Sequence, residues 1–124
     1  MTTRELYDII GGDYDAAMAY LGSERLIARF VGKFPADDSL PRLFRAWESR
    51  DLAEAFSAAH EAKGMCANLY LKDLQERASQ VTELLRPQNV TNSNLSYVDA
   101  QVLELHKRYD ASIRAISTWL ESTS

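Results

Sequence analysis

The sequence has little of what several specialised protein classes require. Only one cysteine, Cys66, occurs among the 124 residues, so no disulfide can form within the chain, and no Cys or His lies at metal-ligand spacing from it. No apolar run approaches the roughly 18 to 20 residues that span a bilayer, and the first residues lack a basic-then-apolar secretory pattern. We therefore expect a cytoplasmic protein with no membrane contact.

Neither positive nor negative residues strongly dominate the sequence. The chain has 18 acidic and 14 basic residues, a net charge of -4, and its basic residues are scattered among acids. This balance gives no electrostatic attraction toward a phosphate backbone, so we expect no nucleic-acid partner. The hydrophobic share of 46% and the length near the modal size of a domain predict one folded domain over residues 1–124.

Helix-forming residues dominate what is present. Only three prolines and five glycines occur, and apolar residues recur at helical spacing, with Val98, Val102, Leu105, Tyr109, Ile113, Ile116 and Leu120 forming the stripe of the last helix. The pattern predicts helices over residues 3–10, 13–21, 23–34, 40–47, 51–69, 71–86 and 96–121. We expect an all-α fold, an antiparallel four-helix bundle with additional short N-terminal helices, and a longer crossover near residue 90.

Helix boundaries are also predicted by single residues. Gly11 should end the first helix, and Asp13, Ser23 and Asp51 should cap the starts of later ones. Leu26, Ile27, Phe30, Val31 and Phe34 should form the apolar face of the helix over residues 23–34.

The helix predicted over residues 51–69 has two different sides. At about 100° per residue, its core side consists of Ala55, Ala58, Ala59, Ala62, Met65, Cys66 and Leu69. The opposite side carries His60, Lys63, Gly64 and Ala67, with Phe56 and Asn68 at its edges. The residues able to do chemistry therefore lie away from the expected core.

Three residues on this second side are informative in combination. An isolated histidine there is most often an ordinary surface residue. Glycine in mid-helix costs about 0.5–1 kcal/mol relative to alanine, so Gly64 indicates that a partner needs the space, or alternatively that helices pack closely there. Lys63, one turn after His60, can hydrogen-bond the oxygens of a phosphoryl group on the imidazole.

The segment from His60 to Leu69, HEAKGMCANL, resembles the H-x-x-K-G-x-x-[small]-[Asn/small]-[aliphatic] signature of histidine-containing phosphotransfer (HPt) domains. By pattern, the resemblance covers roughly residues 8 to 86. The helix over residues 96–121 matches only as the element that completes a bundle. The chain is thus similar to the HPt proteins of two-component phosphorelays.

The resemblance implies roles for individual residues. His60 would accept a phosphoryl group through its outer ring nitrogen, Lys63 would stabilise the phosphate, and Gly64 would give a receiver domain room to approach. Phe56, Ala67 and Asn68 would belong to the docking surface. For Phe56, the alternative that the N-terminal helices cover it is equally open.

The resemblance also implies partners. These are response-regulator receiver domains and a sensor or hybrid histidine kinase, because 124 residues contain no kinase core. The chain would be a phosphohistidine intermediate and a monomer, without a cofactor or metal of its own, since the receiver supplies the catalytic aspartate and the divalent ion.

Three positions depart from the family pattern. Ala62 stands where leucine is usual, and Tyr70 stands where glycine is common. Thr82 stands where many members carry a glutamine that hydrogen-bonds the active histidine, so this contact is in doubt.

The main alternative is a non-catalytic helical adaptor, in which His60 is incidental and an exposed helix face binds a partner. An ordinary enzyme is disfavoured, because no second catalytic histidine, carboxylate pair, glycine-rich phosphate loop or metal cluster accompanies His60. His106 is surrounded by charged neighbours, as a solvated surface ring would be.

Overall fold

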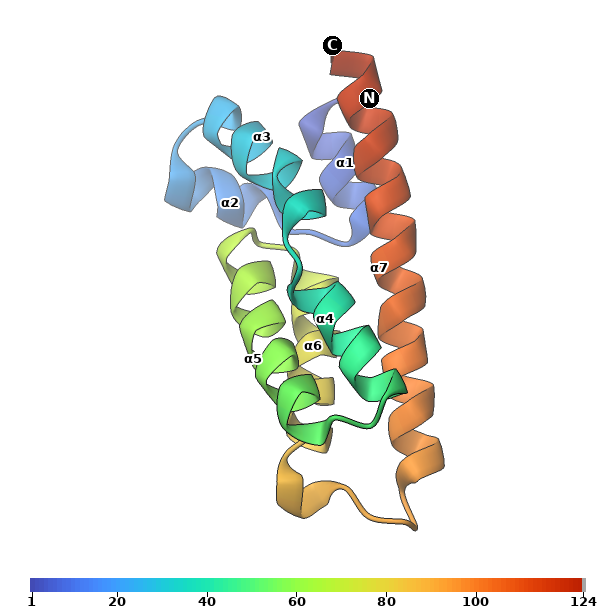
Figure 1. The fold of residues 1–124 in the computed structure, drawn as a ribbon. Helices are drawn as coiled ribbons and strands as arrows, with labels where there is room; N and C mark the ends of the chain where they lie inside the picture. Colours follow the sequence, from blue (N-terminus) through green and yellow to red (C-terminus); the bar gives the residue numbers. More distant parts are fainter. Residues whose placement is uncertain (124) are drawn as a thin grey trace.

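The computed structural model describes residues 1–123, which form seven α-helices and two short 3₁₀-helices without any strand (Figure 1). The elements are α1 (Thr3–Ile10), α2 (Tyr14–Leu21), α3 (Glu24–Gly32), η1 (Phe34–Ala36), α4 (Ser39–Glu48), α5 (Leu52–Asn68), α6 (Lys72–Leu84), η2 (Pro87–Asn89) and α7 (Leu95–Thr123). The predicted all-α fold is confirmed. No helix within this range is both long and apolar enough to cross a membrane.

The ends of the helices follow the predicted caps. The side chains of Asp13, Ser23 and Asp51 each accept a hydrogen bond from the backbone N–H three residues on, at 3.0, 3.3 and 3.2 Å. Gly11 ends α1 with φ +72°, a left-handed conformation that glycine adopts without steric cost. The local sequence therefore accounts for where α1, α2, α3 and α5 begin or end.

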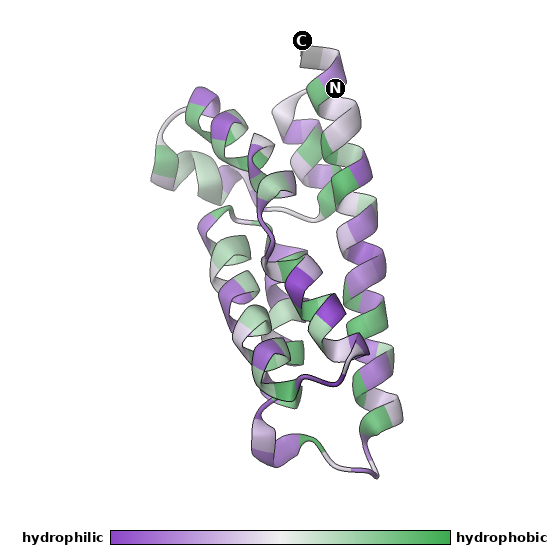
Figure 2. Cartoon of the chain, in the orientation of Figure 1, coloured by the Kyte–Doolittle hydropathy of each residue, from purple (hydrophilic) through white to green (hydrophobic). Residues whose placement is uncertain are grey.

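Four helices, α4 to α7, enclose most of the core. In this group α4 packs against α5, α5 against α6, α6 against α7, and α7 against α4. Each helix carries hydrophobic and hydrophilic residues on different sides (Figure 2). The buried side of α5 is made of small residues, Ala55, Ala58, Ala59, Ala62 and Cys66, whereas α4, α6 and α7 contribute larger ones such as Leu43, Leu74 and Leu105. This small-residue side lets the neighbouring helices approach α5 closely.

The N-terminal helices α1–α3 lie at the end of the molecule where α5 finishes (Figure 1). Three hydrogen bonds join them to the turn between α5 and α6 and to the first turn of α6. The hydroxyl of Tyr7 donates to the carbonyl oxygen of Leu69 at 2.9 Å. The backbone N–H of Asp13 donates to the carbonyl oxygen of Tyr70 at 2.9 Å. The backbone N–H of Asp73 donates to the carbonyl oxygen of Gly11 at 3.0 Å. The short N-terminal helices thus fix the turn that follows α5.

The Tyr7 hydroxyl should contribute measurably to stability. Tyr7→Phe leaves the buried carbonyl of Leu69 without this donor, and we expect a loss of about 1–2 kcal/mol in the free energy of unfolding by urea. Tyr97→Phe, at an exposed tyrosine on α7, is the control and should change it by less than about 0.5 kcal/mol. A Tyr7→Phe protein as stable as the wild type would contradict the prediction.

Burial also raises the pKa of Tyr7 to about 12. A phenol whose pKa is higher in the folded than in the unfolded state stabilises the fold fully below its unfolded pKa of about 10. This contribution is lost as the pH rises from there toward 12, so the stability difference between the wild type and Tyr7→Phe should shrink over that range.

Several local predictions differ from the structure. Phe30 was expected on the buried face of α3 and Met65 on that of α5, but Phe30 is 38% exposed and Met65 is half-buried. In α7, Leu120 is exposed and Trp119 takes the buried position instead. The connection between the helices predicted over residues 23–34 and 40–47 contains the 3₁₀-helix η1. These residues lie at the ends of helices, where the neighbouring elements rather than the helical period decide burial.

Candidate functional site

His60 lies in the middle of α5 on its solvent-exposed side. Its imidazole forms no hydrogen bond or ion pair with another residue of the described chain. The nearest aromatic ring is that of Phe56, one turn earlier, which stacks beside it with ring centroids 6.4 Å apart and an interplanar angle of 21°. A neutral imidazole in this position keeps a ring nitrogen open to solvent, where it can act as a nucleophile.

The ring of Phe56 also contacts a cationic side chain, that of Arg86. The guanidinium carbon of Arg86, which follows α6, lies over the Phe56 ring at 5.4 Å from its centroid. The N-terminal helices lie toward the opposite end of α5, so they do not cover Phe56 as one alternative had it (Figure 1). Phe56 is half-buried and remains part of the surface beside His60.

Arg86 was not identified as a site residue from the sequence. The α5–α6 hairpin returns the end of α6 to the first turns of α5, and this antiparallel pairing is the signal that could have found it. Arg86 is held by Glu83 through hydrogen bonds of 2.8 and 3.2 Å. These bonds lower the pKa of the Glu83 carboxyl, and the charges of Arg86 and Lys63 act in the same direction. Lys63 and Arg86 are therefore the two cations near His60, and both lie close enough to Glu83 to lower the pKa of its carboxyl.

Gly64 has no packing function within the chain. A Cβ atom built on Gly64 would meet no heavy atom within 4 Å, and the residue is exposed. The alternative that Gly64 permits close contact between helices is therefore wrong. Glycine lowers the stability of a helix relative to alanine, and no contact within the chain explains why glycine stands at position 64.

Ala67 and Asn68 occupy the last turn of α5, on the side of His60 or next to it. Ala67 is half-buried and Asn68 is exposed. Both line a groove that α2 and α3 close from the other side.

Thr82 does not supply the hydrogen bond that a glutamine gives the histidine in many family members. Its side chain is buried, and its hydroxyl donates to the carbonyl oxygen of Ala78 in the same helix at 2.7 Å. The ring of Phe56, with its centroid 6.4 Å away, is thus the side chain that stacks beside the His60 imidazole.

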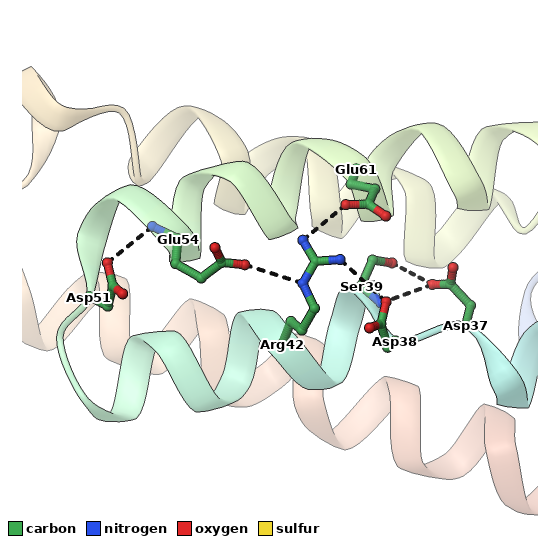
Figure 3. A network of polar contacts seen from close by, with 7 residues as sticks. All are labelled: Asp37, Asp38, Ser39, Arg42, Asp51, Glu54 and Glu61. Carbon is green, nitrogen blue, oxygen red and sulfur yellow. Dashed lines mark hydrogen bonds and ion pairs between the residues drawn. The ribbon is translucent and has the colours of Figure 1, made fainter.

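A network around Arg42 joins α4 to α5 next to the site (Figure 3). The guanidinium donates to Asp38 at 3.2 Å, to Glu54 at 3.2 Å and to Glu61 at 2.9 Å. The hydrogen bonds with Glu61 and Glu54 raise the pKa of Arg42 above its usual range. Arg42 thereby holds the carboxylate of Glu61, the neighbour of His60 in the chain, toward α4. A carboxylate turned toward the imidazole would instead repel a phosphoryl group.

Other reactive groups lie apart from this surface. Cys66 is fully buried, and burial raises the pKa of its thiol to about 12, so the thiolate is disfavoured. His106 stacks on Phe44 with centroids 4.0 Å apart and lies 3.6 Å from Asp110. Among residues 1–123, no three His, Cys, Asp or Glu side chains come close enough to hold a metal ion.

The site thus combines an exposed histidine, a lysine one turn later and an open glycine on one helix of a small helical domain. The family model described as Hpt domain matches residues 26–115, which include α4, α5, α6 and His60. The chain belongs to the Hpt domain family, and its function lies in phosphotransfer in two-component signalling. Comparisons with curated proteins and with solved structures found no match.

Proposed function

We propose that this protein is a phosphorelay carrier that receives a phosphoryl group on His60 from a receiver-domain aspartate, or from a kinase, and passes it to the receiver of a response regulator. The proposal rests chiefly on Gly64, which leaves open space beside His60 that nothing in the fold requires. An adaptor that binds through the same helix face has no need for the exposed imidazole. In this proposal α4 to α7 act as the antiparallel four-helix bundle that presents the histidine.

The transfer step requires a nucleophile on this chain and an acyl phosphate on the partner. The lone pair on Nε2 of His60 attacks the phosphorus atom of the aspartyl phosphate, and a P–N bond forms. The P–O bond to the aspartate breaks, and the carboxylate leaves with the electron pair. The proton on Nδ1 stays on the ring. Attack by a second receiver's carboxylate reverses the same step.

Neighbouring residues of the chain assist this step electrostatically. Lys63 lies one helical turn from His60, where its ammonium group can donate to the phosphoryl oxygens. Gly64 lets the partner backbone come close, and the ring of Phe56 lies beside the imidazole. The divalent ion and the catalytic aspartate belong to the receiver. The proposed partners therefore are receiver domains and a sensor or hybrid histidine kinase, met in the cytoplasm by a monomeric carrier.

A two-stage transfer experiment tests the carrier function. A receiver domain is phosphorylated with acetyl phosphate that carries a radioactive label on its phosphoryl group. It is then separated from the remaining acetyl phosphate and mixed with this protein. We expect label on this chain that is labile to acid and stable to base, as an N–P bond is. A second, unphosphorylated receiver added afterwards should remove the label.

The helical-adaptor alternative predicts a different outcome of the same experiment. An adaptor would bind the receiver without taking its label. A folded protein that stays unlabelled by every receiver offered, although it binds one of them, would overturn the carrier function.

A further inference from the structure

A groove separate from the His60 surface lies where the first residues of the chain meet α3 and the end of α7 (Figure 1). This terminal groove has a volume of about 710 Å³, and its lining includes Met1, Glu24, Arg25, Arg29, Trp119 and Leu120. No residue of α5 lines it, so it is distinct from the surface around His60 and Gly64.

The terminal groove carries positive charge that the chain does not neutralise. Arg25 and Arg29 are exposed one turn apart on α3, and neither guanidinium forms a hydrogen bond or ion pair with another residue of the range 1–123. The acidic residue of the lining, Glu24, is close to the phenol of Tyr14. Burial raises the pKa of Tyr14, and the Glu24 carboxylate raises it further. In a chain of net charge -4, the two arginines therefore form a local basic site.

The groove also contains a buried hydrogen-bond donor that lacks an acceptor. Trp119 is 3% exposed, and its indole Nε1 is buried without a partner among the described residues. The other tryptophan, Trp47, has the usual arrangement, because its Nε1 donates to Asp99 at 2.9 Å. A buried N–H without an acceptor lowers stability, so a ligand that supplies an acceptor to Trp119 gains by doing so.

The N–H edge of Trp119 points away from α3 at Gly32. A Cβ atom added to Gly32 would lie 3.8 Å from Cζ3 of Trp119, on the opposite edge of the indole from Nε1. Beside the indole, Leu120 and Met1 are each 40% exposed and give the groove an apolar part. A ligand that fits this lining has negative charge, a hydrogen-bond acceptor and an apolar group.

The spacing of the two arginines favours an extended peptide as this ligand. Residues four apart on a helix are about 6 Å apart along its axis. In an extended chain, side chains on the same side are two residues apart, which is about 6.6 Å. Carboxylates at alternate positions of a peptide can therefore each pair with one arginine. A small anion such as acetate has no apolar group to lie on Leu120.

We propose that the terminal groove binds an acidic, extended segment of a partner protein. Two carboxylates at alternate positions pair with Arg25 and Arg29, an apolar side chain lies on Leu120, and an oxygen of the segment accepts from Nε1 of Trp119. Because Nε1 is buried in the free protein, the segment reaches it by displacing part of the groove lining. This binding goes beyond the proposed phosphotransfer and leaves the His60 surface free.

An NMR titration of the ¹⁵N-labelled protein tests the proposal. The probe is the peptide acetyl-Leu-Glu-Ser-Glu-Leu-amide, and its control has glutamine in place of both glutamates. We expect the indole N–H signal of Trp119 to move downfield as it gains an acceptor, while that of Trp47, already bonded to Asp99, stays in place. The glutamine peptide should bind at least about tenfold more weakly, because it lacks the charges that pair with the arginines.

A double variant tests the arginines. Arg25→Gln combined with Arg29→Gln should weaken binding of the acidic peptide at least about tenfold. Labelling of His60 by phosphoramidate, a small phosphodonor, should stay at the wild-type rate in this variant. Arg45→Gln, at an exposed arginine on α4, is the matched control and should bind the peptide like the wild type.

The proposal is overturned if the acidic peptide leaves the Trp119 signal in place, if the glutamine peptide binds equally well, or if the double variant binds like the wild type. It is also overturned if vesicles of phosphatidylglycerol move the Trp119 signal and the peptide does not, since the groove then contacts a membrane surface. A signal that moves with protein concentration alone would mean that a second copy of the chain fills the groove, which also overturns it. Failure of phosphoramidate to label the folded wild type contradicts the carrier function and not the groove.

Discussion

His60→Gln is expected to abolish phosphorylation completely, whether the donor is a receiver domain or phosphoramidate. Glutamine has roughly the length of histidine but no nucleophilic ring nitrogen, so the acceptor is lost while the surface is kept. His60 is exposed and hydrogen-bonded to no other described residue, so the free energy of unfolding should change by less than about 0.5 kcal/mol. Acid-labile label on the purified proteins is the measurement.

The chain offers a matched control, because its second histidine lies elsewhere. His106→Gln removes a ring that stacks on Phe44 in α4, outside the His60 surface. This variant should keep wild-type labelling, although the loss of stacking can lower its stability slightly. Equal labelling of His60→Gln and the wild type would show that the acceptor is another residue.

Substitutions of Gly64 are expected to change stability and transfer in opposite directions. Alanine at a mid-helix position is favoured over glycine by about 0.5–1 kcal/mol, and the added Cβ meets nothing within 4 Å. Gly64→Ala should therefore raise the free energy of unfolding by about that amount. Gly64→Leu should also fold. It should nevertheless slow transfer from a receiver on the order of 100-fold, because displacing the partner by about 1 Å misaligns the reacting atoms.

The control for added bulk is Ala100→Leu, at an exposed position on α7. It should leave both the receiver-dependent and the phosphoramidate-dependent labelling unchanged. Gly64→Leu should also keep its phosphoramidate labelling, because a small donor needs little space. If Gly64→Leu takes label from receivers as fast as the wild type does, the open space beside His60 has no function in docking.

Most of the fold follows from local signals in the sequence. The capping side chains of Asp13, Ser23 and Asp51 and the left-handed Gly11 act within a few residues, so their effect on helix ends could be predicted without knowing the tertiary structure. The exposure of Phe30 could not. It depends on α2 and the end of α5 leaving one side of α3 uncovered, and helical period alone carries no information on that arrangement.

The candidate site was predictable along one helix and not across helices. Spacings of three and four residues placed His60, Lys63 and Gly64 on one side of α5 from the sequence. Arg86 comes from a segment 26 residues away from His60, and only the packing of α6 against α5 brings it to the surface beside His60. The same packing shows that Gly64 faces open space, which the sequence left undecided.

The most direct test of phosphotransfer through His60 is to observe the phosphorylated imidazole itself. The protein is labelled with ¹⁵N in its histidine rings, phosphorylated with phosphoramidate and examined by NMR at neutral pH. We expect a one-bond ³¹P–¹⁵N coupling at Nε2 of His60 and unchanged ring signals from His106. A coupling at His106, or a phosphorylated protein without any coupling to a ring nitrogen, would contradict it.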